Sequence, residues 1–390
     1  MRLSVCLIAR NEEINLPRAL SSVAEVADEI VVADTGSTDR TPQIASERGA
    51  RVVHFPWCDD FSAARNHALD HATGDWILWL DADEELLPES HPELRQSLEV
   101  DSAMAYMILR RDLASLDDPN AFTEMWQLRL FRRRPDLRFR GRCHPDFHPS
   151  ILEIAKSDGM EVRTSGVTIR HYGYLGPLRE SKRRRGARLL ELELQDRPGQ
   201  LYYLIEYARA LMASNDPRAP GVLAEAAGIL LQRASEPRAP MPPAALLLET
   251  LLQLPPHELP TGWTNALARD LSHRWFPESA PLVWIRAQQA FDAGHFEEAE
   301  TLLRQLVQMG RTRNYDRHTS FDPRIIGPDA LLNLGVCCVR QAKLDTAERV
   351  FKQLLSARER VSEARANLET IRRLRRKVVP RRTSGRSRRK

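Results

Sequence analysis

The sequence predicts an α/β domain with a mostly parallel sheet, followed by an all-α helical-repeat domain. Residues 1–80 alternate short apolar strands with helical segments, which is typical of parallel sheets covered by helices. Beyond Leu201 no strand pattern remains, and one short motif occurs twice, 48 residues apart. We therefore expect an α/β domain over residues 1–195, helical repeats over residues 196–370 and a basic, disordered tail over residues 371–390.

The elements of the first domain follow from the spacing of apolar residues and from the turn residues between them. Gly36 permits a tight turn, and Thr41 with Pro42 forms a suitable start for a helix. The expected strands are Leu3–Ile8, Ile30–Ala33, Arg51–His54 and Trp76–Leu80, and the expected helices are Asn11–Ala24, Thr41–Arg48 and Phe61–His71.

The strand Trp76–Leu80 stops at four acidic residues within five positions, beginning with Asp81 and Asp83. In open α/β sheets, ligands bind beyond the carboxyl ends of the strands. Two carboxylates placed there could hold Mg2+ or Mn2+ together with a diphosphate. The alternative is that these acids only complement the dipole of a following helix.

Composition excludes several classes of protein. The chain contains neither Gly-x-Gly-x-x-Gly nor Gly-x-x-x-x-Gly-Lys-Ser/Thr, so dinucleotide and P-loop sites are not expected. The net charge of +4 comes from the tail, which holds eleven Lys or Arg residues and no acid. A domain-wide basic surface is missing, so a nucleic-acid partner is not expected, despite seven arginines between Arg129 and Arg142.

We expect a cytoplasmic protein without a transmembrane segment. The N-terminal apolar stretch is short and soon meets Arg10 and Asn-Glu-Glu, unlike a signal peptide. No apolar run approaches the length of a membrane span. The five cysteines are scattered without metal-ligand spacing, which is typical of reduced thiols.

Four segments in order resemble glycosyltransferase family 2. They are Arg10-Asn-Glu-Glu, Val31-Val-Ala-Asp-Thr-Gly-Ser-Thr-Asp-Arg-Thr, Asp60-Phe-Ser-Ala-Ala-Arg-Asn and Gly74-Asp-Trp-Ile-Leu-Trp-Leu-Asp-Ala-Asp-Glu. The resemblance implies a GT-A fold, a nucleotide-diphosphate sugar as donor, a divalent metal (Mn2+ or Mg2+) and inversion at the anomeric carbon. A UDP-sugar is the expected donor.

The resemblance also implies roles for individual residues. The segment that includes Ala9, Arg10, Asn11 and Glu13 would hold the base and ribose together with Asp34, and Arg65 would lie near the nucleotide. Asp81 would meet the ribose or the metal, and Asp83 would be the principal metal ligand.

Other interpretations of these residues remain open. Asp34 and Asp39 flank a turn and are suited to capping it. Arg65 has neighbouring acids at Asp59 and Asp60 that could simply pair with it.

Two later segments resemble elements of the same family. Arg138-Phe-Arg-Gly-Arg-Cys-His-Pro-Asp is similar to a Phe-x-Gly-Arg-Val-His-Glu element in which His144 matches and Pro145 replaces the glutamate. If that glutamate is the catalytic base in relatives, Asp146 is the nearest substitute, and Glu84 and Glu85 are further candidates. Ile169-Arg-His-Tyr-Gly-Tyr would supply His171 as a third metal ligand, unless this histidine is structural.

The helical half resembles tetratricopeptide repeats. Gly294-His-Phe-Glu-Glu-Ala-Glu and Ala342-Lys-Leu-Asp-Thr-Ala-Glu are the repeated motif, and Ala287 and Gly335 occupy the same position before each copy. Such repeats form concave binding surfaces, so we expect them to present a protein, peptide or glycan acceptor. An insertion, Arg311–Arg324, is either a recognition loop or a packing element.

Two other functions are considered. Pro145 at the position of the glutamate suggests a catalytically inactive transferase-like scaffold that binds proteins through its repeats. A nucleotidyltransferase would also use paired carboxylates and metal. It would need a glycine-rich loop after the first strand, where this chain has Ala9-Arg-Asn-Glu-Glu.

Overall fold

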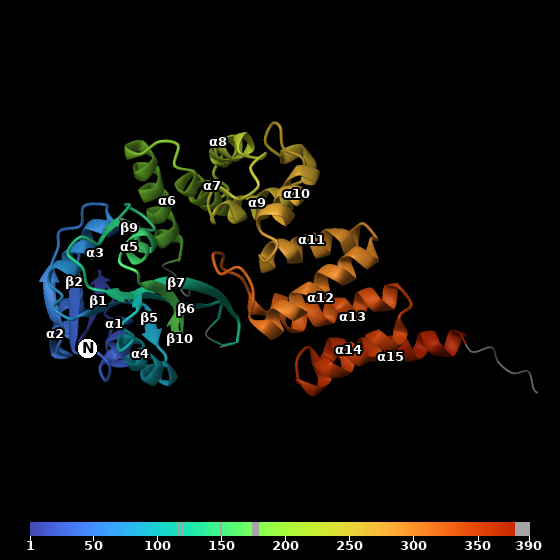
Figure 1. Ribbon diagram of the computed structural model, residues 1–390, viewed down its shortest axis with the longest axis horizontal. Coiled ribbons are helices and arrows are strands. Elements are labelled where there is room, and N and C mark those ends of the chain that lie inside the picture. Colours follow the sequence, from blue (N-terminus) through green and yellow to red (C-terminus); the bar gives the residue numbers. More distant parts are fainter. Residues whose placement is uncertain (116, 119, 149, 174–178, 379–390) are drawn as a thin grey trace, which may run out of the picture. The chain divides into compact units, whose positions relative to one another are not determined.

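The computed structural model describes residues 1–378 apart from residues 116, 119, 149 and 174–178. The chain forms two compact units (Figure 1). The first holds residues 1–250, 254–264 and 317–322, and the second holds residues 251–253, 265–316 and the described residues from Pro323 onward. No helix among the described residues combines the length and the hydropathy needed to cross a membrane.

The first unit is built on an eight-stranded sheet with the order β3-β2-β1-β4-β7-β6-β10-β5. Strands β7 and β5 run opposite to the other six, so the predicted mostly parallel α/β fold is confirmed. A separate hairpin joins β8 and β9. The strands are β1 (Leu3–Ala9), β2 (Glu29–Asp34), β3 (Arg51–His54), β4 (Trp76–Trp79), β5 (Glu84–Leu86), β6 (Ala103–Leu113), β7 (Phe122–Arg132), β8 (Arg138–Arg140), β9 (Asp146–His148) and β10 (Glu161–His171).

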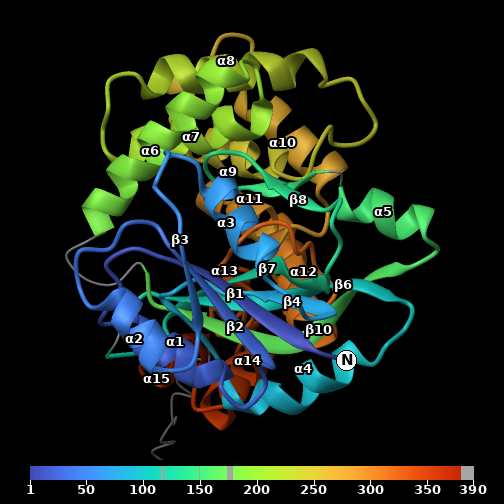
Figure 2. The same ribbon diagram turned by 90° about the vertical axis from the view of Figure 1, so that its left-hand side faces the viewer.

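Helices cover both faces of the sheet, as the near-continuous burial of β1 and β4 requires (Figure 2). Trp76 and Leu78 of β4 pack in one core with α1 (Leu16–Val23), α2 (Thr41–Glu47) and α4 (His91–Leu98). Ile77 and Trp79 pack in the other with α3 (Phe61–Asp70) and α5 (Ile151–Ser157). Alternate residues of one strand therefore support both layers.

Helix α1 begins at Leu16, later than the expected Asn11. Asn11 has a φ of 55°, which is left-handed and incompatible with a helix start. The backbone N–H of Glu12 donates to the Thr41 hydroxyl at 2.8 Å, and that of Glu13 donates to Asp39 at 3.2 Å. The residues after β1 are therefore a loop tied to the start of α2.

Three helices after the sheet also belong to the first unit: α6 (Arg179–Asp196), α7 (Leu201–Ala213) and α8 (Ala219–Gln232). Leu189 of α6 and Tyr203 of α7 share a core with Cys143, and Trp57 packs against it. Residues 196–250 thus belong to the same compact unit as the sheet, although the sequence analysis assigns them to the repeat domain.

The second unit contains the predicted repeat. Helices α11 and α13 begin at residues 280 and 328, and α12 and α14 begin at residues 296 and 344, so each helix pair recurs after 48 residues. A Cβ on Gly335 would lie 2.4 Å from the ring of Phe351, so only glycine allows α13 and α14 to pack this closely. The helices of this unit are α10 (Asn265–Trp275), α11 (Ala280–Asp292), α12 (Phe296–Thr312), η3 (Pro323–Ile326), α13 (Pro328–Arg340), α14 (Leu344–Ser356) and α15 (Val361–Val378). Helix α9 (Ala244–Gln253) has residues 244–250 in the first unit and residues 251–253 in the second, and the short helices η1 (Pro88–Ser90) and η2 (Pro256–Glu258) belong to the first.

Two expectations about the helical half change. Residues 371–378 continue α15 and are not part of a disordered tail, because Ile371 is buried and Arg375 pairs with Glu348 at 2.6 Å. Residues 379–390 lie outside the described part of the chain. In the insertion, Phe321 is buried and exchanges two backbone hydrogen bonds with Glu124 of β7, at 2.8 and 3.1 Å, so this part of the insertion is a packing element.

Candidate active site

The acidic segment after β4 forms a tight turn that leads into strand β5. The backbone N–H of Asp81 donates to Oε2 of Glu84 at 2.8 Å, and the N–H of Glu84 donates to the carbonyl of Asp81 at 3.0 Å. No helix starts here, so the helix-dipole interpretation of these acids does not hold. Because β1, β2, β4 and β10 are parallel, the turn shares its sheet edge with Ala9, Asp34 and His171.

Asp83 lies between a histidine and a lysine from distant parts of the chain. Its Oδ1 is 3.6 Å from Nε2 of His171, and Nζ of Lys182 donates to its Oδ2 at 2.7 Å. A Cβ on Gly173 would lie 2.4 Å from both Asp83 Oδ2 and His171 Nε2. Burial works to raise the pKa of Asp83, but His171 and Lys182 outweigh it and hold this pKa below its usual range.

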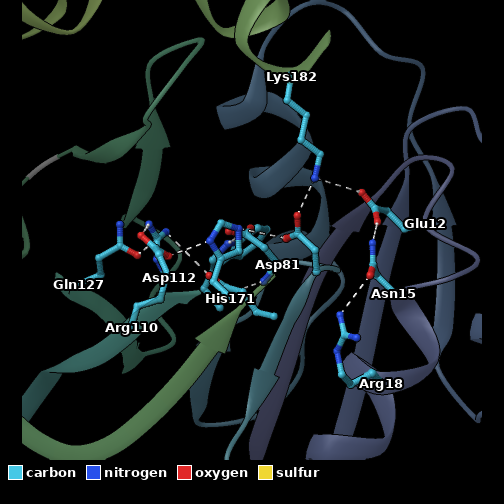
Figure 3. Close-up of polar contacts among 12 residues, drawn as sticks. Glu12, Asn15, Arg18, Asp81, Arg110, Asp112, Gln127, His171 and Lys182 are labelled. Carbon is cyan, nitrogen blue, oxygen red and sulfur yellow. Dashed lines mark hydrogen bonds and ion pairs between the residues drawn. The ribbon is translucent and has the colours of Figure 1, made fainter. Parts of the chain in front are cut away.

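A second carboxylate orients His171. Its Nδ1–H donates to Oδ1 of Asp112 at 2.8 Å, and Asp112 is in turn 2.8 Å from Nε of Arg110 (Figure 3). This arrangement directs Nε2 of His171 toward Asp83. Burial works to lower the pKa of His171, but Asp112 and Asp83 outweigh it and raise this pKa to about 9.

Asp81 faces arginines. Its oxygens lie 3.2 Å from Arg129 and 3.5 Å from Arg65, so Arg65 pairs with Asp81 and not with the neighbouring Asp59 or Asp60. Although burial works to raise the pKa of Asp81, these two guanidinium groups lower it to about 2. Arg129 also reaches Glu84 at 2.8 Å, where burial raises the pKa of that carboxyl.

The residues present fit a divalent cation at Asp83 and His171. A hard carboxylate oxygen and an imidazole nitrogen converge there, with Asp112 behind the histidine, which is a common environment for a metal-binding histidine. Asp81 is directed to the arginines instead. Within the described ranges, no three His, Cys, Asp or Glu side chains are arranged to hold a metal ion, so other ligands would have to complete the site.

The loops after β1 and β2 are joined beside this turn. Asp34 is 4 % exposed and accepts from the N–H groups of Gly36 and Ser37 at 3.3 Å, so it caps its own turn. Oδ1 of Asn11 accepts from the N–H of Thr38 at 2.8 Å. The loop Ala9–Glu13 is thereby fixed against the loop that follows Asp34.

The segment expected on the acceptor side places His144 and Asp146 differently. His144 has a φ of 47°, and its Nδ1 lies 3.5 Å from Oε2 of Glu206 in α7. Burial works to lower the pKa of His144, but the neighbouring Cys143 and Glu206 outweigh it and raise this pKa to about 9. Asp146 is exposed at the start of β9, and its Oδ1 accepts from the N–H of Phe147 at 2.7 Å.

The other candidate bases have partners already. Glu84 is fully buried beneath Arg129, and Glu85 accepts a hydrogen bond from the hydroxyl of Tyr172 at 2.6 Å.

Sequence reasoning missed four residues described above: Arg110, Asp112, Lys182 and Glu206. Asp112 had a usable signal, because it is an acid near the end of a strand, as Asp34 and Asp83 are. Lys182 had none, because it lies in a basic helix ninety-nine residues after Asp83.

Residues 4–152 match the family model described as glycosyl transferase family 2. These residues contain β1, β2 and the Asp81–Glu84 turn, whereas His171 and Lys182 lie beyond the matched range. The N-terminal domain is a glycosyl transferase family 2 domain.

Two relatives are similar to part of this chain. A TPR repeat-containing protein of Synechococcus elongatus is 43 % identical over 223 residues, which are 56 % of this chain and 54 % of the relative. An uncharacterized glycosyltransferase of Rickettsia bellii is 39 % identical over 110 residues, 27 % of this chain and 37 % of the relative. The chain thus spans about half or less of the length of these relatives.

Among solved structures, a mannosyltransferase from Pyrobaculum calidifontis in complex with GDP-Man and Mn2+ is 19 % identical. The similarity covers 63 % of this chain and 78 % of that one, with a TM-score of 0.39.

Proposed function

We propose that this chain is a metal-dependent, inverting glycosyltransferase that moves a sugar from a nucleotide-diphosphate donor, a UDP-sugar, to a protein, peptide or glycan acceptor. The observation that carries the proposal is the Asp83–His171 pair, oriented by Asp112, at the carboxyl edge of a family 2 sheet. The helical repeats of the second unit are the proposed acceptor-binding surface.

The loops at this edge are the proposed nucleotide site. The base and ribose would lie against Ala9, Arg10, Asn11, Glu13 and Asp34, which belong to two loops already tied together by hydrogen bonds. Arg65 would lie beside the nucleotide, where Asp81 and the ring of Trp79 hold its guanidinium in place. Asp81 would then contact the ribose and would not coordinate the metal. Arg65 and Arg129 balance its charge.

Asp83 and His171 would hold Mn2+ or Mg2+. The bound ion would stabilise the negative charge that develops on the leaving nucleoside diphosphate. Phosphate oxygens and water would complete its ligands. Asp112 keeps the imidazole turned toward Asp83, and Gly173 leaves the space beside both ligands open.

Gly173→Ala is expected to weaken Mn2+ binding by roughly 10- to 100-fold, the usual cost of disturbing groups around metal ligands. The new methyl group would have to displace both the carboxylate of Asp83 and the ring of His171. Electron paramagnetic resonance of free Mn2+ measures the affinity. Gly221→Ala in α8, where a Cβ meets nothing within 4 Å, is the control. Equal Mn2+ affinity in both variants would contradict the proposed metal position.

The proton acceptor is proposed to be Asp146, with His144 beside it on the same loop. Asp146→Asn is expected to lower the rate of transfer by about 10²- to 10⁴-fold, as for loss of a general base. Glu206→Gln is the informative comparison, because Glu206 is the carboxylate that pairs with His144. If Glu206→Gln abolishes transfer and Asp146→Asn changes the transfer rate little, the general base is Glu206 and not Asp146.

A thermal-shift screen of nucleotide sugars with Mn2+ tests the proposed function. A donor present at about 100 times its Kd stabilises the fold by about 2.7 kcal/mol, which is roughly 5–10 °C for a unit of this size. We expect such a shift with one UDP- or GDP-sugar and none when Mn2+ is omitted. No shift with any donor would contradict the proposal.

Pro145 in place of the expected glutamate favours the second candidate, an inactive transferase-like scaffold. The two candidates differ in turnover of the donor. Hydrolysis of the preferred nucleotide sugar above background, abolished by Asp83→Asn, would refute the scaffold. Donor binding without any hydrolysis or transfer would support it.

A further inference from the structure

Lys182 connects two parts of the proposed donor site. It lies in α6, and its Nζ is 2.7 Å from Oδ2 of Asp83. The same Nζ is 3.9 Å from Oε1 of Glu12 (Figure 3). Glu12 belongs to the loop after β1, which is the proposed nucleotide loop. The side chain of Lys182 is 30 % exposed whereas that of Asp83 is 12 % exposed, so the ammonium group reaches the carboxylate from the solvent side.

A lysine and a divalent metal compete for this carboxylate. Mg2+ or Mn2+ binds carboxylate oxygens at about 2.0–2.2 Å, so an ion on Asp83 would lie within a few ångströms of an ammonium that is bonded to the same group. Two cations at that separation repel each other, most strongly in a partly buried site. Lys182 therefore has to leave Asp83, at least in part, when a metal binds.

The donor offers the displaced ammonium a new partner. Two other cations at this edge, Arg65 and Arg129, are already held by Asp81 and Glu84. Lysine carries a compact charge on a flexible stem and binds phosphate as a point charge. A short movement of the Lys182 side chain takes its ammonium from Asp83 toward the diphosphate of a donor bound beside Glu12.

We infer that Lys182 is the counter-ion of Asp83 in the donor-free protein, that a divalent metal displaces it, and that its ammonium then binds the diphosphate of the donor. This inference rests on the proposed function and adds a donor-binding residue to it. It predicts that one substitution at Lys182 changes two affinities in opposite directions.

Lys182→Met is the test, with MnCl2 and a nucleoside diphosphate as probes. Without nucleotide, Mn2+ is expected to bind about 3- to 10-fold more tightly, because its competitor is gone. With Mn2+ present, UDP or GDP, whichever the unsubstituted chain binds more tightly, is expected to bind about 10-fold more weakly. Electron paramagnetic resonance measures the first affinity and calorimetry the second.

Two further variants separate this role from a structural one. Arg184→Met removes a neighbouring charge of α6 that is 75 % exposed and pairs with Glu180, and it should change neither affinity. Lys182→Arg keeps the charge and should retain most of the nucleotide affinity even if Lys182→Met unfolds. Weakening of both affinities, or no change in either, would overturn the inference while leaving the proposed function intact. Failure of the unsubstituted chain to bind Mn2+ and nucleotide would refute both.

Discussion

Asp83→Asn is expected to lower the rate of donor hydrolysis by roughly 10²- to 10³-fold, the range found when one preorganised electrostatic group is removed from an active site. The amide keeps the shape of the carboxylate but removes the negative charge that His171 and Lys182 now share. It also offers a metal a weaker oxygen ligand. Release of nucleoside diphosphate from the preferred nucleotide sugar, followed with and without Mn2+, measures this effect.

The matched control for that variant is Asp70→Asn in α3. Asp70 is 52 % exposed and pairs with Arg138 at the surface, so its neutralisation should leave the rate within about twofold and stability within about 1 kcal/mol. An Asp83→Asn protein that folds normally and still hydrolyses the donor at the original rate would rule out Asp83 as the metal ligand.

Arg129→Met is expected to cost about 3–5 kcal/mol of folding free energy, as when one partner of a buried ion pair is removed. The side chain of Arg129 is 6 % exposed and that of Glu84 is fully buried. Without Arg129, the nearest remaining cation to Glu84 is Arg110, at 3.9 Å. Denaturant unfolding, followed by circular dichroism, measures the loss.

This destabilisation should depend on pH. Burial already raises the pKa of Glu84, and loss of the Arg129 charge would raise it further. A carboxyl whose pKa is higher in the folded than in the unfolded state holds more protons when folded, so stability falls as pH rises above about 4.3, its unfolded value. The deficit of Arg129→Met should therefore be larger at pH 8 than at pH 5.

Arg134→Met is the control for Arg129→Met. Arg134 pairs with Asp136 and Asp158 while 32 % exposed, and surface pairs of this kind contribute about 0–1 kcal/mol. An equal loss of unfolding free energy in Arg129→Met and Arg134→Met would contradict a buried ion pair between Arg129 and Glu84. A loss in Arg129→Met that becomes larger as the pH is lowered would also contradict it.

The parts of the site that could be predicted are those set by strand ends. The apolar runs that became β1, β2 and β4 predict parallel neighbours, and parallel neighbours bring Ala9, Asp34 and Asp83 to one edge. The Gly335 and Phe351 positions of the repeat were predictable for a similar reason, because helix packing repeats with the sequence.

The remaining contacts depend on pairings that leave little trace in local sequence. His171 faces Asp83 because β10 pairs with β5, which sets Glu84 opposite His171. Asp112 reaches His171 through the register of β6 with β10, and Lys182 reaches Asp83 from a helix after the sheet. The packing of α6 and α7 around Cys143 likewise extends the first unit beyond residue 195.

The central claim is that Asp83 and His171 form the metal end of a nucleotide-sugar site. Calorimetric titration of UDP- and GDP-sugars into the full chain, with and without Mn2+, tests it most directly when repeated with Asp83→Asn. We expect saturable binding of one donor that requires Mn2+ and that is weakened at least about 10-fold by the substitution. Donor binding of equal strength in both proteins, or no binding to either, would contradict the claim.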